Sequence, residues 1–184
     1  SLFAPAGIEA LNAGISSLEE LEITEAVKHF ETASLVLGAH SKMKEKRNTA
    51  LRLLAQALLS KGDLRGARSI YIQLLRIDPN ATMSDASIKP SEKRLLQFAQ
   101  EAIAENRTGS VAINTHRDGR AVFIDGVYSG LSPLVLRGLS AGRHHVRISA
   151  DGYRDALFHT FIGPAKRKRL SARLKPASRG DLYG

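Results

Sequence analysis

The chain has 184 residues, no cysteine and a formal net charge of +9 at pH 7. This length allows one domain or two small ones, and the lack of cysteine excludes disulfides, thiolate metal sites and a cysteine nucleophile. No apolar run reaches about 18 residues, so we expect no transmembrane segment. The sequence starts at Ser1 rather than at a methionine, so the lack of a visible signal peptide does not decide where the protein resides.

The positive charge is concentrated in the second part of the chain. Residues 1–108 carry 14 Lys and Arg against 13 Asp and Glu, whereas residues 109–184 carry 13 against 5. The net charges are therefore +1 and +8. This asymmetry predicts two domains, of which the second is attracted to anionic surfaces.

Apolar residues at helical spacing predict five helices in the first part of the chain. Thr24 and Ser91 are the expected N-caps of the second and fifth helices, and Asp78-Pro79-Asn80 is expected to end the fourth. Residues 1–5 are expected to form a lead-in, and residues 80–90 a loop. The predicted helices span about 6–21, 24–37, 41–59, 64–77 and 91–105.

The helix pairs resemble one another in the positions of small and aromatic residues. Gly14, Ala26, Phe30 and Ala33 in the first pair recur in register as Ala55, Ala67, Tyr71 and Leu74 in the second. At these residues the chain resembles tetratricopeptide repeats, most closely over 48–81, with residues 91–105 as a capping helix. The resemblance implies an array of antiparallel helix pairs.

Such arrays form a concave groove that binds peptides or helices of other proteins. The resemblance places six residues of the inner helices in this groove: Leu11, Ile15, Leu18, Thr49, Arg52 and Gln56. Polar Arg52 and Gln56 lie on an otherwise apolar helix, which favours a binding role. The alternative for the three apolar residues is that they belong to the core.

After Gly109 the apolar period changes from helical to two, which predicts strands. Short strands are expected around 111–113, 121–124, 133–136 and 146–150, and the basic run at 166–169 is expected to start the last strand. Asp125-Gly126 and Asp151-Gly152 supply the turns, and Arg137-Gly138 is expected to bound the third strand. This rhythm predicts a small antiparallel β domain.

The turn residues of this part carry a second resemblance. Asp125-Gly126, Gly130, Ser132-Pro133, Gly142, His144, Gly152 and Tyr153 follow the pattern of the PEGA domain, which the chain resembles over about 109–176. The resemblance implies a β-sandwich common in bacterial envelope proteins and hence a periplasmic location. The namesake turn departs from the pattern, because Arg117-Asp118-Gly119-Arg120 lacks the proline and the alanine.

Basic residues of the β part form a candidate patch: Arg117, Arg120, Arg143, Arg147, Lys166, Arg167, Lys168 and Arg169, with Arg173 and Lys175 beyond. One interpretation is a solvated edge strand whose charges prevent edge-to-edge pairing. The other is a surface for an anionic partner such as acidic protein, acidic glycan or phospholipid headgroups.

No residue pattern indicates catalysis, a cofactor or a metal site. His144-His145 would point to opposite faces of a strand, and a pair formed with His159 would lack a third ligand. Ser132, Ser149 and Asp151 have no spacing typical of a nucleophile with its base. Nucleic acid is not the expected partner, because Phe158 and Phe161 are predicted to be core residues rather than stacking platforms.

Together these features predict an α+β two-domain protein. Residues 1–107 form the tetratricopeptide-like α-helical domain, 108–176 the β-sandwich and 177–184 a flexible tail. The expected function is a non-enzymatic adaptor of the bacterial cell envelope in a secretion, pilus or motility assembly. The groove would bind a protein partner and the basic β domain another envelope component. The alternatives are a module that binds peptidoglycan or polysaccharide, and a nucleic-acid binder using residues 166–169; the oligomeric state is left open.

Overall fold

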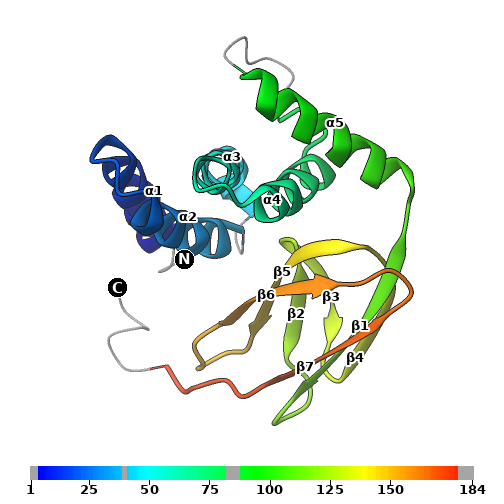
Figure 1. The fold of residues 1–184 in the computed structure, drawn as a ribbon. Helices are drawn as coiled ribbons and strands as arrows, with labels where there is room; N and C mark the ends of the chain where they lie inside the picture. Colours follow the sequence, from blue (N-terminus) through cyan, green and yellow to red (C-terminus); the bar gives the residue numbers. More distant parts are fainter. Residues whose placement is uncertain (1–3, 39–40, 82–87, 178–184) are drawn as a thin grey trace. The chain divides into compact units, whose positions relative to one another are not determined.

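Five α-helices are followed by two β-sheets in the computed structural model, which confirms the predicted α+β two-domain layout (Figure 1). The structure describes residues 4–38, 41–81 and 88–177. The chain divides between Asn106 and Arg107 into two compact units. We call them the helical unit and the β unit and describe each by itself.

The helical unit consists of sequential helices joined by short connections. Its elements are α1 (Ala4–Glu19), α2 (Ile23–Gly38), a short 3-10 helix (Ser41–Met43), α3 (Lys44–Ser60), α4 (Leu64–Ile77) and α5 (Pro90–Ala104). Among the described residues, no helix is both long and apolar enough to cross a membrane. The expected cap of α5 is wrong: Lys89 is the N-cap and Pro90 opens the helix, because proline has the helical φ already and lacks only an N–H that the first turn leaves unbonded.

The core of the helical unit gathers around Phe30 and Tyr71, both fully buried. A Cβ at Gly14 would lie 2.5 Å from the Phe30 ring, so α1 approaches α2 closely only because this position has no side chain. The recurring small and aromatic residues therefore have a packing role. Membership of the tetratricopeptide family stays a prediction.

The β unit contains a three-stranded and a four-stranded sheet. The strands are β1 (Thr108–Thr115), β2 (Ala121–Ile124), β3 (Val127–Leu131), β4 (Leu134–Ser140), β5 (Gly142–Ser149), β6 (Ala156–Ile162) and β7 (Arg167–Ala172). The sheet orders are β4-β1-β7 and β3-β2-β5-β6. The buried residues of both sheets form one core, which includes Val111, Ile113, Val122, Ile148 and Ile162.

Three details of the β unit differ from the expectation. β1 and β7 pair in parallel, whereas the other pairs are antiparallel. β4 continues through Arg137-Gly138, the expected turn, because Gly138, with a φ of +72°, is an extra residue at the register shift between Arg137 and Leu139. Phe161, a predicted core residue, is 59% exposed, since it lies between buried Thr160 and Ile162 on β6 and thus on the opposite side.

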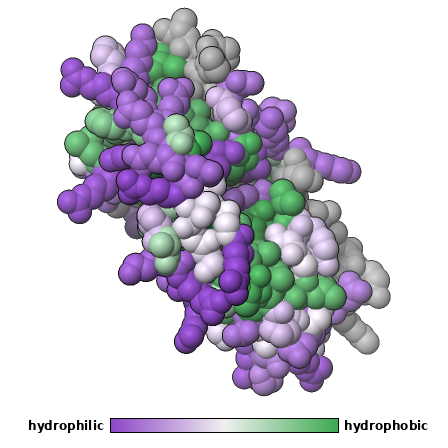
Figure 2. Space-filling view, turned by 90° about the vertical axis from the view of Figure 1, so that its right-hand side faces the viewer, coloured by the Kyte–Doolittle hydropathy of each residue, from purple (hydrophilic) through white to green (hydrophobic). Residues whose placement is uncertain are grey.

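Apolar side chains are also exposed on the β unit. On β3 and β4, Val127, Tyr128, Leu131 and Val135 are between 49% and 68% exposed. Figure 2 shows green apolar surface within a largely hydrophilic face of the molecule. Some expectations fall outside the described residues: the lead-in at 1–3, most of the loop at 82–87, and the tail beyond Ala177.

Candidate functional site

The β unit contains a basic pocket at the carboxyl ends of β1 and β7. Its volume is about 200 Å³, and its lining comprises Thr115, His116, Arg117, Arg120, Tyr153, Arg173, Leu174 and Pro176. Three of the eight residues are arginines, and none of the described lining residues is acidic. We call this cavity the basic pocket.

Ser132 positions the turn that carries two of these arginines. Its buried hydroxyl accepts from the Arg120 N–H (3.1 Å) and shares a hydrogen bond with the Thr115 hydroxyl. Its backbone N–H donates to the Arg120 C=O (2.8 Å), and its C=O accepts from the Gly119 N–H (2.7 Å). A single residue of the Gly-x-Ser-Pro signature therefore holds the segment that follows β1.

An aromatic ring orients one arginine of the pocket. The Arg120 guanidinium lies over the Tyr153 ring at 4.5 Å from the ring centre. Stacking of this kind engages the face of the guanidinium and leaves its N–H groups at the edge available for an anion. Tyr153 is itself held by a bridge to Pro176 and packs against the core.

These residues suit the recognition of a small anionic group. Arginine presents its N–H donors in a planar fork that matches carboxylate and phosphate oxygens. A volume of about 200 Å³ is below that of pockets for drug-sized ligands, roughly 300–1,000 Å³. The pocket therefore fits one charged group of a larger ligand better than a whole cofactor.

The outer face of the three-stranded sheet extends this basic surface. Ser110 on the middle strand lies between Arg137 on β4 and Arg167 on β7, and its neighbour Ala112 pairs with Arg169. All three arginines are exposed. Small residues on β1 are thus flanked by arginines, which leaves a shallow basic strip.

The alternation along β7 divides the basic run at 166–169. Arg167 and Arg169 lie on the outer face, while Lys168 shares the opposite side with Leu170 and Ala172 of the core. Lys166 precedes the strand in the turn, where its N–H donates to the Gly163 C=O (3.1 Å). All four side chains are exposed, but only the two arginines lie together on the outer face of the sheet.

Two arginines of the predicted patch lie elsewhere, on β5 of the other sheet. The Arg147 guanidinium stacks on the Phe123 ring at 3.6 Å and donates to Asp155 (3.2 Å). Arg143 pairs with Phe161 of β6 in the sheet register. The structure therefore does not bring Arg143 and Arg147 together with the basic pocket.

The histidines of β5 have structural neighbours. His144 is buried, with Nδ1 at 2.7 Å from an Asp125 carboxylate oxygen and Nε2 at 2.7 Å from the Ser140 C=O. The His145 N–H donates to the same carboxylate (2.9 Å), so both residues tie the Asp-Gly turn to β5. The His145 ring lies 4.6 Å from that of His159. The part of the chain that the structure describes contains no group of three potential metal-binding side chains.

The apolar residues predicted for the groove differ in exposure. Leu11 is buried in the core, Leu18 packs partly against it, and Ile15 is 37% exposed. Of these three residues, Ile15 is the most accessible to a partner.

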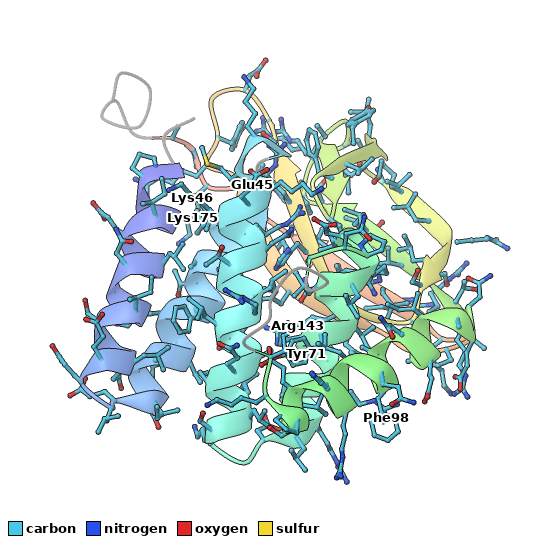
Figure 3. All side chains as sticks on the ribbon, turned by 90° about the horizontal axis from the view of Figure 1, so that it is seen from above. Glu45, Lys46, Tyr71, Phe98, Arg143 and Lys175 are labelled. Atoms are coloured by element: carbon cyan, nitrogen blue, oxygen red, sulfur yellow. The ribbon has the colours of Figure 1, made fainter. Side chains whose placement is uncertain are left out.

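One polar groove residue of α3, Gln56, contacts a buried carboxylate of α5. Gln56 donates to Glu92 (3.2 Å), which is 3% exposed and also accepts from the Tyr71 hydroxyl (2.6 Å). Burial, together with this bond, raises the pKa of Tyr71, whereas the charge of nearby Arg52 acts in the opposite direction. Thr49 donates to the Glu45 C=O of its own helix (3.0 Å). Figure 3 shows Tyr71 among the helices and Phe98 projecting outward from α5.

The sequence does not indicate three residues of the basic surface. Arg137 is expected in a turn, Tyr153 is expected only as part of the PEGA pattern, and His116 is not singled out. Arg173 is expected beyond the basic run, and the odd-numbered residues from 167 to 175 are all exposed. No local signal places His116 or Tyr153 beside Arg120.

Comparison with known proteins supports the identity of the β unit. Residues 108–178 match the family model of the PEGA domain. This match covers the predicted sandwich and includes the turn residues that carried the resemblance. No curated protein matches the chain.

Proposed function

We propose that this protein is a non-enzymatic adaptor of the bacterial cell envelope. The PEGA match is compatible with an envelope context. In this proposal the β unit binds an anionic envelope component through its basic pocket, and the helical unit binds a protein partner. The observation that carries the proposal is a pocket lined by Arg117, Arg120 and Arg173 without an acidic residue among its described lining.

The contacts of the buried polar residues of the β unit agree with a binding role. The buried His144–Asp125 pair would be the natural base of an enzyme, but the second ring nitrogen of His144 faces a backbone C=O. A general base needs a nitrogen directed at the reacting group. This pair instead connects a turn to a strand.

The test uses a charge-neutral variant of the pocket, Arg117→Gln with Arg173→Gln. The matched control, Lys61→Gln with Lys93→Gln, removes the same two charges from exposed positions of the helical unit. Pull-down from an envelope extract and co-sedimentation with purified peptidoglycan are measured from low to high salt. We expect the pocket variant to lose a component that the wild type and the control retain.

The same experiment separates the rival functions. Peptidoglycan binding that persists at high salt would favour a glycan-binding module, and gel shifts with DNA or RNA at low salt would favour a nucleic-acid binder. Equal losses in both variants would show that only net charge matters. Full retention by the pocket variant would exclude the pocket as the site.

A further inference from the structure

We infer that the outer edge of β7 binds an acidic, extended segment of a protein partner as an added β-strand. This inference rests on the proposed function, because it names the ligand class of the basic β unit. It starts from the position of β7, which is the last strand of the order β4-β1-β7. Among the described residues, β1 is the only strand paired with it.

The hydrogen bonds to β1 show which backbone groups face the open edge. The Lys166 C=O accepts from the Ser110 N–H (2.9 Å), and the Ala172 C=O accepts from the His116 N–H (3.1 Å). In a parallel pair, alternate residues direct both backbone groups toward the same neighbour. Even-numbered residues of β7 therefore face β1, and the odd-numbered residues of 167–171 face away from it.

The chain itself uses this edge a few residues later. The Lys175 C=O accepts from the Arg154 N–H (2.9 Å), and the Ala177 N–H donates to the Gly152 C=O (2.9 Å). Odd-numbered residues that follow the strand thus already form hydrogen bonds with a neighbouring segment. An added strand would continue this ladder over residues 167–171.

The side chains along the open edge of β7 are mostly positively charged and therefore favour a negatively charged partner. Arg167, Arg169, Arg173 and Lys175 are exposed at odd-numbered positions, with Ser171 between them. Alternate residues of a strand recur at about 6.6 Å. An extended peptide with an acidic residue at every second position has the same period, and each cross-strand pair of opposite charges contributes about 0.2–1 kcal/mol.

The same charges exclude the commonest competing partner. A second copy of β7 would place arginines opposite arginines, which is the usual protection of an edge strand against self-pairing. An acidic strand meets no such repulsion. Arg173 also lines the basic pocket, so a carboxylate at the end of the added strand has a binding site there.

An acidic peptide can contact both the backbone and the arginines of this edge, whereas other polyanions can contact only the arginines. Only a peptide offers N–H and C=O groups at the spacing of the β7 backbone as well as charges at the spacing of its arginines. An acidic glycan or a nucleic acid would use the arginines alone.

The binding test compares four labelled probes by fluorescence anisotropy with the full chain at low and at physiological salt. They are an eight-residue peptide of alternating Glu and Thr, a block peptide in which four glutamates precede four threonines, an oligouronate with four carboxylates, and an oligothymidylate with four phosphates. We expect the alternating peptide to bind at least tenfold more tightly than the block peptide. Equal affinities, or tighter binding of the glycan or the nucleotide, would overturn strand addition.

Amide hydrogen exchange provides a readout that electrostatic attraction would not change. Binding of the alternating peptide should slow exchange at Arg167, Arg169 and Ser171 at least tenfold. Lys168 and Leu170 should change little, because their backbone faces β1. A uniform change or none at the odd-numbered amides would contradict the inference.

A variant tests the backbone contact directly. Ser171→Pro removes an N–H at the open edge, where proline is tolerated, and should reduce peptide affinity at least tenfold, while Ser171→Ala should bind like the wild type. Unchanged binding by a folded Ser171→Pro would refute the inference, and the exchange pattern of the wild type decides if that variant does not fold.

The outcomes distinguish this inference from the proposed function. If Arg117→Gln with Arg173→Gln loses an envelope component but the alternating peptide has no advantage, the adaptor stands and strand addition fails. If the pocket variant loses nothing and no probe binds, both fail.

Discussion

Ser132 shows how a fold signature can serve a binding surface. It is 3% exposed and contacts both ends of the segment that carries Arg117 and Arg120. A residue that carries the resemblance to the PEGA domain thus also positions Arg117 and Arg120, at which the chain departs from the pattern of that domain.

We expect Ser132→Ala to weaken both the fold and the pocket. Loss of a buried hydroxyl that has two partners costs about 1–2 kcal/mol of unfolding free energy, measurable by urea denaturation. Anion binding should weaken as well, because the Arg120 backbone loses an anchor. Ser129→Ala is the control, since the Ser129 hydroxyl donates to the C=O of Val127 in its own strand. Equal stability of both variants would contradict the anchoring role.

Asp78 connects the end of α4 to the start of α3. Its carboxylate accepts from Lys44 (3.1 Å) and Asn48 (2.8 Å) on α3, and from the Asn80 N–H (3.2 Å). The hydrogen bond from Lys44 is the main cause that lowers the pKa of Asp78, with further help from Asn80 and Asn48 and with desolvation opposing. The Asp-Pro-Asn sequence is therefore an interhelical contact as well as a helix end.

The lowered pKa predicts acid sensitivity with a defined sign. Because the folded state favours the ionised carboxylate, its stabilisation is complete above the ordinary aspartate pKa of about 3.9 and is lost as pH falls through the lowered value. Asp78→Asn should be less stable than the wild type at pH 7, and the difference should shrink below pH 4. Urea midpoints between pH 7 and 2.5 test this, with exposed Glu19→Gln as the control. A difference independent of pH would contradict the charge-based explanation.

At the scale of elements, the sequence predicted features that depend on residues only a few positions apart, such as turns and helix ends. The Asp125-Gly126 turn ends β2, and α4 has the predicted bounds, because cap and turn residues act within a few positions. The parallel β1–β7 pair could not be predicted, since it joins residues more than fifty positions apart. The predicted third strand is shorter than β4 because glycine weakens a strand, whereas Gly138 is accommodated in β4 at a register shift.

For the candidate site, too, the sequence indicated individual residues but not their arrangement in space. Arg117, Arg120, Arg167 and Arg169 stood out as charge in the sequence, whereas their partition between a pocket and a sheet face depends on pairing register. In the helical unit, Glu92 is buried although glutamate is usually exposed. Its bond to Gln56 could therefore not be predicted from the sequence.

The helical elements predict where a protein partner would bind. Among the groove residues, Ile15 combines an apolar side chain with 37% exposure. Ile15→Glu should therefore reduce recovery of the protein partner at least tenfold in a pull-down without a loss of stability. Leu64→Glu, at a 58% exposed position at the start of α4, is the control. Equal recovery by both variants would move the partner site away from α1.

For the whole molecule, charge is unevenly divided between the units. The β part carries 13 basic against 5 acidic residues, and the remainder is close to neutral. An anionic surface therefore attracts the β unit first, over about 8 Å at physiological salt.

The parallel pairing of β1 with β7 has a mechanical consequence. β1 is the first strand of the β unit and β7 is the last, so the start of β1 and the end of β7 lie at opposite ends of the same parallel ladder. Tension applied along the chain would pull these two strands past each other and load their hydrogen bonds together, in shear. An antiparallel first and last strand would instead open one bond at a time. A domain built in this way resists force in the direction of its own backbone.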